Sequence, residues 1–458
     1  MADVTDTFDF DFEDSIQLSP PKNKKKKLIG LDDLLDDFYK EQHIKLAEKK
    51  SKRAKVKIDK EDENDHDDRE AELSKFVGHC EDKMTEIGGD DEMPLWGIQV
   101  FGKQKTFPEV VTPDIKSTYF WKSITSLELN SMVGLQSVED KGEKFLEGLL
   151  VDGWLLKLVV ACKKVEKPIA MWTFDLMIYS TSAVFSAAAY DFWKDVLSLK
   201  NERIEISWLP GYFEVKNALD NYGFLFGSPS ISRCNKETLF ADPKVEGPQN
   251  ITALIKFLAV CFHSRKHLNF STSEVEDIVV VIICLFLDRQ LLGLSEKLNQ
   301  CLASIVSYFQ DDEWRSSSDS IAKSIAYRLP KDINCLRTVE SISGVDERLK
   351  QLRSAVAFEF LVLCFDCQSP VAEEILRLVM SINVRDKTCD LLNLYIYIGL
   401  AENWLLCNPA TRDKPVIREM WNVCLKNCSC HISNTDLRSY ASKLRSKASY
   451  LLQGIDNK

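Results

Sequence analysis

The stretch DIVVVIICLFLD, residues Asp277–Asp288, places ten consecutive apolar residues between two carboxylates. Ten residues are too few to cross a bilayer as a helix, which takes about 20 residues. Ser273 and Glu276 stand ahead of the run in the S-x-x-E pattern of a helix capping box, so we predict a helix rather than a buried strand. Apolar residues recur at helical spacing on both sides. We therefore expect this helix to be the buried middle layer of a helical stack.

Charge is distributed unevenly along the 458 residues. Residues 1–92 carry a net charge of −10, whereas the remainder carries −1. A nearly neutral body argues against a dominant nucleic-acid groove, so contact with DNA is expected to be at most indirect or weak. Fourteen cysteines and an acidic N-terminus without a signal-peptide pattern predict reduced thiols in the cytosol or nucleus. The apolar runs are all too short for a transmembrane helix, and we expect no membrane partner.

Residues 1–92 have the composition of a disordered acidic tail, because they are highly charged and poor in β-branched residues. Aromatic and acidic residues alternate at Phe8, Phe10 and Phe12. These rings are candidates for docking on a partner with a basic rim, and a purely solvating tail is the alternative.

A basic run in the same tail predicts nuclear import. Lys24, Lys25, Lys26 and Lys27 follow a Ser-Pro-Pro triplet at 19–21, and a second basic stretch lies at 49–57. As alternatives to an import signal, these lysines could bind DNA phosphates loosely or simply form a charged linker.

A short amphipathic pattern follows the basic run. Leu31, Leu34, Leu35 and Phe38 share one face of a two-turn helix, with aspartates on the other face. Such a helix is too short to persist alone, so we expect it to fold in a partner's groove. A chance pattern, or docking on the chain's own body, is the alternative.

Residues 93–142 are expected to hold an extended arm and a first helix, from 113 to 129. Trp96 and Phe101 stand among glycines at the start of this arm and are candidates for partner binding. The simplest arrangement lays the arm on the helical body.

Residues 143–458 show an almost wholly helical pattern, which predicts a HEAT- or armadillo-like body of stacked helix pairs. Breakers make residues 201–248 its weakest helical section. The expected helical stretches are 145–160, 170–199 as one helix or two, 250–310, 317–328, 345–367, 369–381, 386–406, 415–425 and 434–452.

Catalytic motifs are missing from the sequence. It contains no phosphate loop, no dinucleotide-binding G-x-G-x-x-G and no G-x-S-x-G elbow, and three of its six histidines lie in the tail. We therefore expect no enzyme activity, no cofactor and no small-molecule substrate.

Three groups of cysteine and histidine residues have spacings that resemble parts of metal or redox sites. Cys424, Cys428, Cys430 and His431 carry zinc-ligand types in a C-x3-C-x-C-H pattern. This is not the paired C-x2-C of a zinc knuckle, and adjacent ligands strain tetrahedral geometry. We favour core packing for this cluster, as for the C-x-x-C at 364–367, and surface groups at a helix end for the H-x-x-x-H at 263–267.

The helical layout and the Trp96–Phe101 junction together resemble the CANIN-domain family (coiled-coil, SMC- and NSE-interacting). Its members are the non-SMC-element loader subunits of the structural-maintenance-of-chromosomes (SMC) complex that serves DNA repair. Length, tail and helical body are most similar to the plant type, over roughly residues 90–450. The resemblance implies a helical-repeat subunit that pairs with a second helical non-SMC element. It also implies recruitment of the SMC complex to damaged DNA and restraint of its ATPase.

These observations predict an all-α, HEAT/armadillo-like solenoid with a disordered acidic N-terminal tail. We expect a nuclear, non-catalytic protein-binding scaffold whose partners are the second helical non-SMC element and the SMC subunits. One alternative is a nuclear adaptor for transcription or ubiquitin-ligase assembly, and another is an enzyme with an unrecognised helical site. Co-purification would distinguish the scaffold from the adaptor, because the first would bring SMC and non-SMC-element subunits and the second would bring ligase or promoter factors.

Overall fold

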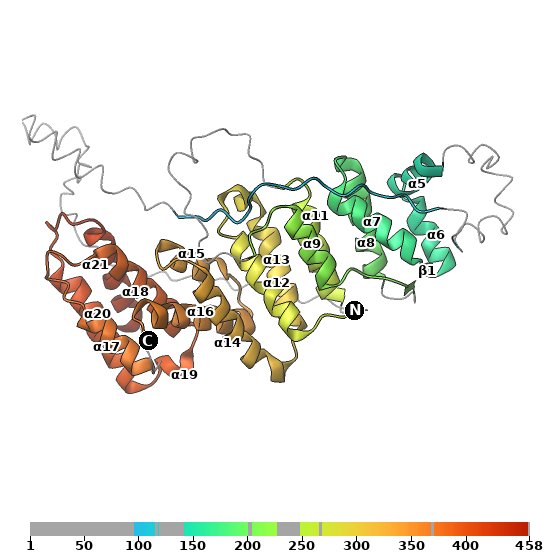
Figure 1. Ribbon diagram of the computed structural model, residues 1–458. Helices are drawn as coiled ribbons and strands as arrows, with labels where there is room; N and C mark the ends of the chain where they lie inside the picture. The colour runs from blue at the N-terminus through green and yellow to red at the C-terminus, as the bar shows by residue number, and fades with distance from the viewer. Residues whose placement is uncertain are drawn as a thin grey trace, which may run out of the picture. The chain divides into compact units, whose positions relative to one another are not determined.

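The computed structural model describes residues 96–114, 118, 142–199, 204–226, 248–264, 268–367 and 371–456. These residues fold almost entirely into helices, which confirms the all-α prediction (Figure 1). Strands within the described ranges are limited to β1 (Lys164–Val165) and β2 (Glu205–Ile206), which pair in parallel. No single described helix is long and apolar enough to cross a membrane, although Thr272–Leu285 and Arg289–Tyr308 together reach that length across a 106° bend.

The helices before the quoted apolar run are α5 (Gly142–Val151), α6 (Trp154–Cys162), α7 (Lys167–Tyr179), α8 (Ala183–Ser198), α9 (Tyr212–Asn221) and α11 (Ile251–Ser264). The run itself lies in α12 (Thr272–Leu285), followed by the 3-10 helix η3 (Arg289–Leu294), α13 (Ser295–Tyr308), α14 (Asp311–Arg328) and α15 (Ile333–Ser341). The remaining helices are α16 (Glu347–Cys364), α17 (Ala372–Ser381), α18 (Leu391–Leu406), α19 (Pro409–Arg412), α20 (Pro415–His431) and α21 (Ala441–Asp456).

The apolar run is buried along its whole length, as the sequence predicts. Every residue from 278 to 287 is buried, and α12 packs against α13, α14 and α15. The expected capping box at Ser273 and Glu276 is wrong by two residues. Ser271 caps the helix, because its Oγ accepts from the Glu274 backbone N–H and Glu274 Oε2 accepts from the Ser271 N–H at 2.7 Å. The same S-x-x-E spacing occurs twice, and the earlier copy lies where the helix begins.

Asp288, the second carboxylate of the quoted stretch, is buried and ends the run. Its Oδ1 accepts from the backbone N–H of Gln290 at 3.0 Å, which caps η3. Its Oδ2 faces the backbone N–H of Val100 at 3.4 Å. Burial raises the pKa of this carboxyl, and the two backbone hydrogen bonds oppose that shift. The carboxylate therefore joins the end of α12 to the segment 96–107, which we call the arm.

Successive helices pack on near neighbours along the chain. Helix α8 contacts α7 and α11, and α13 contacts α11 and α12. Helix α16 contacts α14, α15 and α18, while α21 contacts α18 and α20. Their buried side chains form one continuous hydrophobic cluster. A helix with an apolar stripe buries it against such neighbours, which is the main source of stability in helical proteins of this size.

Several predicted helix boundaries need correction. The expected helix 145–160 is broken into α5 and α6, because Gly153 adopts a left-handed conformation with φ 72°. Residues 170–199 form two helices, α7 and α8. Helix α15 was not predicted, and α20 runs on to His431 beyond the expected end at 425. The expected helix at 434–452 begins later, at Ala441. The expected first helix at 113–129 lies outside the described residues, apart from 113, 114 and 118.

Candidate protein-binding surface

The helices α18, α19, α20 and α21 lie together at the end of the described chain (Figure 1). Their residues line a groove of about 980 Å³. We call it the C-terminal groove. Its apolar lining consists of Leu405, Leu406, Ile417, Trp421, Tyr450 and Leu451.

The floor of the C-terminal groove is buried, whereas its edges are open to solvent. Ile417 is fully buried and Trp421 is 7% exposed. Leu406 is 57% exposed and Tyr450 is 73% exposed. Covering one such large side chain contributes about 1.5–3 kcal/mol before ordering costs. Two exposed apolar edges beside a preformed apolar floor are the arrangement expected of a surface that binds another apolar segment.

Charged residues surround this apolar lining. Glu402 pairs with Lys447 at 2.5 Å, with both side chains mostly buried, and this pair joins α18 to α21. Arg412 pairs with the neighbouring Asp413 at 3.0 Å. Arg418 is exposed on α20 and makes none of the ion pairs found among the described residues. The Arg418 guanidinium at the rim is therefore accessible to a carboxylate of a bound partner.

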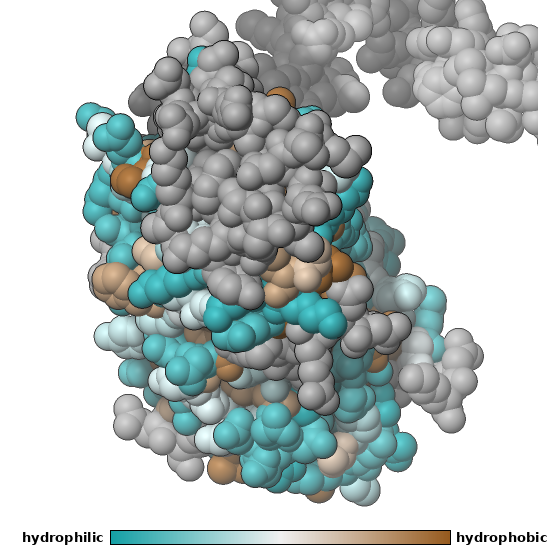
Figure 2. Space-filling model, turned by 90° about the vertical axis from the view of Figure 1, so that its right-hand side faces the viewer, coloured by the Kyte–Doolittle hydropathy of each residue, from teal (hydrophilic) through white to brown (hydrophobic). Residues whose placement is uncertain are grey.

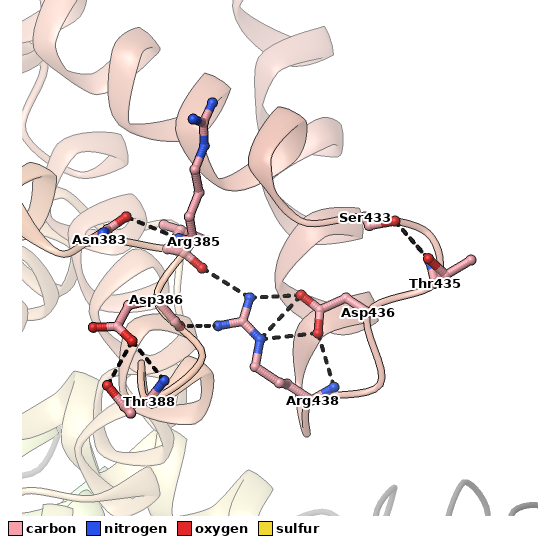
Figure 3. A network of polar contacts seen from close by, with 9 residues as sticks. Asn383, Arg385, Asp386, Thr388, Ser433, Thr435, Asp436 and Arg438 are labelled. Atoms are coloured by element: carbon pink, nitrogen blue, oxygen red, sulfur yellow. Dashed lines mark hydrogen bonds and ion pairs between the residues drawn. The ribbon is translucent and has the colours of Figure 1, made fainter.

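Figure 3 shows a polar network that includes the loop before α21. Helix α21 carries Tyr450 of the groove. The Arg438 guanidinium donates to both oxygens of Asp436, at 3.0 Å and 2.7 Å. It also donates to the backbone carbonyls of Asp386 at 2.6 Å and Val384 at 2.9 Å, in the loop between α17 and α18. The hydrogen bonds from Arg438 lower the pKa of the Asp436 carboxyl. One side chain thus fastens the loop before α21 to the loop before α18, and both helices line the groove.

A tyrosine pair on the inner side of the same helices adds to this attachment. Tyr395 of α18 and Tyr440, just before α21, meet edge to face with ring centroids 5.4 Å apart. Lys447 lies 5.7 Å above the Tyr395 ring while its ammonium pairs with Glu402. These contacts fix α21 against α18, so the groove is preformed and needs no ordering of its walls.

A different face of the molecule gives a contrast. Figure 2 views the chain from the side where α5 and α6 lie, and its visible described residues are mostly hydrophilic with separate hydrophobic patches. Trp154, at the start of α6, is 53% exposed, and Lys157 Nζ lies 4.2 Å from the centre of its ring. An exposed aromatic residue is not unusual by itself. The C-terminal groove differs because its exposed residues border a concave apolar floor.

Trp96, predicted as a partner-binding residue, lies at the start of the arm against the chain's own body. Its ring is 5.8 Å from the Arg289 guanidinium and 5.4 Å from that of Arg337. The next residue, Gly97, donates its backbone N–H to Asn334 Oδ1 at 2.7 Å. Gly97 has φ +111°, and a Cβ there would lie 2.8 Å from Arg289 Cγ. Glycine is therefore required at this close approach of arm and body.

Phe101, the second predicted residue of the arm, is 6% exposed and also packs within the chain. It forms an isolated antiparallel bridge with Phe224, and the two rings meet edge to face at 5.8 Å. The Leu225 backbone N–H donates to the Val100 carbonyl at 3.0 Å. This is the arrangement expected if the arm lies extended on the helical body. Whether these two residues also bind a partner stays a prediction.

The cysteine and histidine cluster of α20 is divided between core and surface. Cys424 and Cys428 are buried, whereas Cys430 and His431 are exposed. The two buried thiols lie four residues apart in the same helix, on the face that packs into the core. In the described part of the chain, no group of three or more His, Cys, Asp or Glu residues is placed to hold a metal ion.

The tail motifs fall outside the described residues. This applies to the aromatic residues Phe8, Phe10 and Phe12, the lysines 24–27, and the pattern Leu31, Leu34, Leu35 and Phe38. Their predicted roles stay predictions.

Sequence reasoning missed the groove residues Leu406, Arg418 and Tyr450. A signal was present for Tyr450, because this aromatic residue falls off the apolar stripe of its helix that runs through Leu444 and Leu451. Arg418 carries no signal, since a lone arginine on an amphipathic helix is usually a solvated group.

Comparison with known proteins gives no match to this chain, among family models, curated proteins or solved structures.

Proposed function

We propose that this protein is a non-catalytic scaffold, a loader subunit that joins a second helical non-SMC element to the SMC complex of DNA repair in the nucleus. The resemblance to the CANIN-domain family suggests these partners. The observation that carries a scaffold role is the C-terminal groove, with its buried apolar floor and exposed Leu406 and Tyr450.

The proposal includes a HEAT/armadillo-like repeat body. Packing of each helix on near neighbours in the chain supports it, as in the series α8–α11–α13 and α14–α16–α18. In such stacks each unit contacts only adjacent units, and binding surfaces lie along exposed helix faces and at the ends.

The occupant we propose for the C-terminal groove is an amphipathic helix of the second non-SMC element. A helix lays an apolar stripe into a groove through side chains at i, i+3, i+4 and i+7. Trp421 would meet that stripe from below, with Leu406 and Tyr450 at its sides. The exposed Arg418 favours a carboxylate on the flank of the incoming helix, and this makes the contact selective.

The test measures affinity of the purified second non-SMC element for the full chain and for Tyr450→Ala. We expect this variant to weaken binding roughly 10- to 100-fold, since truncating an aromatic residue that a bound helix covers costs about 1–3 kcal/mol. Tyr327→Ala is the matched control, because Tyr327 is a helical tyrosine that is 80% exposed and does not line the groove. Unchanged affinity of Tyr450→Ala, or equal losses in both variants, would remove the groove from the proposal.

Charge gives a second arm of the same experiment. Arg418→Glu should weaken binding more than Arg418→Gln, because it places a carboxylate against the proposed carboxylate of the partner. Equal effects of the two variants would mean that no acidic group faces Arg418.

The tail carries the nuclear and accessory parts of the proposal. Replacing lysines 24–27 by alanine should reduce nuclear accumulation of a reporter fused to residues 1–92. If the second basic stretch, at 49–57, is sufficient for import, only replacement of both stretches will reduce the accumulation. Leu35→Ala with Phe38→Ala should weaken partner binding and leave the melting temperature unchanged. Co-purification of ligase or promoter factors in place of SMC subunits would favour the adaptor alternative.

A further inference from the structure

The loop between α15 and α16 presents a serine that is followed by two carboxylates. Its sequence is Ser343-Gly344-Val345-Asp346, and Glu347 follows as the first residue of α16. All five residues are exposed, with Val345 at 91%. Gly344 has φ +141°, a conformation that residues with a side chain rarely adopt. Enzymes that modify proteins reach such exposed, irregular loops more readily than they reach helices.

The Ser343 hydroxyl lies close to a cation of the next helix. Its Oγ donates to Asn299 Oδ1 of α13 at 2.9 Å. Arg353 Nε of α16 donates to the Ile342 carbonyl at 2.5 Å, which holds the guanidinium against the residue that precedes Ser343. The ion pairs found in the described part of the chain do not include Arg353. A guanidinium without a carboxylate partner is therefore fastened next to Ser343.

Other serines with a carboxylate three residues later show what distinguishes Ser343. In the described ranges they are Ser271, Ser273, Ser316 and Ser433. The first three begin or lie within α12 and α14, where the backbone is helical. Ser433 lies in a loop, but the Asp436 side chain is only 14% exposed because it pairs with Arg438 at 2.7 Å. The Glu347 side chain stays 66% exposed beside Lys350, so the loop at Ser343 combines an open backbone with an accessible carboxylate.

We propose that Ser343 is a phosphorylation site for an acidophilic serine/threonine protein kinase. Such a kinase recognises carboxylates that follow the target serine through basic groups of its own, and Asp346 and Glu347 supply them. Ser343 Oγ attacks the γ-phosphorus of ATP, so an O–P bond forms while the bond from that phosphorus to the β,γ-bridging oxygen breaks. ADP leaves with the bridging oxygen, and the hydroxyl proton passes to the catalytic aspartate of the kinase.

Phosphorylation changes which helix the loop contacts. A phosphate dianion has no proton to donate to Asn299 Oδ1, so the hydrogen bond of Ser343 to α13 is lost. Its three acceptor oxygens suit a guanidinium, and Arg353 is already held beside the serine through the Ile342 carbonyl. The modified loop is therefore expected to leave α13 and to pair with Arg353 of α16 through charge-assisted hydrogen bonds.

The test incubates the full-length protein with magnesium ATP and an acidophilic casein kinase, and maps phosphopeptides by mass spectrometry. We expect phosphate on Ser343, lost in Ser343→Ala and retained in the matched control Ser433→Ala. Asp346→Asn removes a carboxylate but keeps a side-chain oxygen that can accept from the Arg348 N–H, as Asp346 does at 2.8 Å. This variant should be phosphorylated at Ser343 roughly tenfold more slowly. Absence of phosphate at Ser343, or an unchanged rate in Asp346→Asn, would overturn the proposal.

The role of Arg353 is tested by comparing the phosphorylated and unphosphorylated forms of each variant. Hydrogen–deuterium exchange at the loop amides 343–346 should slow about 2- to 5-fold when the wild type is phosphorylated. Arg353→Gln should lose this slowing, because Asp346 and Glu347 then repel the phosphate without a cation to offset them. Arg385→Gln is the matched control and should keep it, since Arg385 is exposed in another loop. Equal slowing in wild type and Arg353→Gln would overturn the pairing of the phosphate with Arg353.

Discussion

Truncation of Phe101 to alanine should release the arm without unfolding the helical body. The ring is 6% exposed and contacts Phe224 edge to face. Removing a buried phenylalanine ring costs about 3–5 kcal/mol, with the aromatic pair included. The arm precedes the helices in the chain and is attached by a short series of contacts, so the cost falls on its docking equilibrium and not on global unfolding.

The structure names the amides that report this opening. Within the arm, the backbone N–H groups of Gly97, Ile98, Gly102 and Lys105 donate to acceptors in the body. A loss of about 3 kcal/mol in docking free energy corresponds to exchange roughly 100-fold faster at these four amides. Amides in the middle of α12 should keep their wild-type rates, because they exchange through global opening.

Hydrogen–deuterium exchange with peptide-level mass spectrometry measures both sets in one experiment. Phe213→Ala is the matched control, since that phenylalanine is 69% exposed on α9 and its loss should change stability by less than about 0.5 kcal/mol. Unchanged exchange in the arm would refute the docking energy assigned to Phe101. Equal acceleration of arm and α12 amides would refute independent opening and make the arm part of the cooperative core.

Three further predictions concern the body. Ile282→Asp places an unpaired charge at a position that is 1% exposed, so it should lower the unfolding free energy by several kcal/mol and lower the melting temperature with it. Leu292→Asp, at a 48% exposed position, should change the melting temperature little. Comparable melting temperatures for these two variants would contradict the buried position of α12. Burial raises the pKa of Asp175 to about 6 from 3.8, so the folded state loses stability relative to the unfolded state as pH rises from about 4 through 6. Asp175→Asn should therefore have a higher melting temperature than wild type at pH 8, and this difference should vanish below about pH 4. A melting-temperature difference that does not change with pH would argue against an ionisation effect. Arg438→Gln leaves the carbonyls of Val384 and Asp386 without their guanidinium donor and should lower the unfolding free energy, measured by chemical denaturation, by about 1–3 kcal/mol. Arg385→Gln should leave it almost unchanged, because the Arg385 side chain is exposed and points away from the network in Figure 3. Equal losses in the two variants would mean that the network does not hold α21.

The sequence by itself determined the helical class and the buried position of residues 278–287. Periodicity and capping chemistry are local, so a continuous apolar run behind an S-x-x-E pattern indicates a buried helix without knowledge of its neighbours. The register of the cap was less certain, because Ser271 and Ser273 both begin an S-x-x-E and only the contacts of the folded helix distinguish them. The arm was also predictable, since Trp96 and Phe101 are too apolar to remain in water and their glycines permit close approach.

Only the tertiary structure decided which residues from distant parts of the chain meet. The C-terminal groove joins Leu406, Trp421 and Tyr450 from three helices, and nothing in their local sequence fixes the angle at which those helices pack. Arg438 reaches carbonyls more than 50 residues earlier in the chain. Short helices such as α15 form because neighbours cover their apolar face, and that covering energy is absent from any local window of sequence.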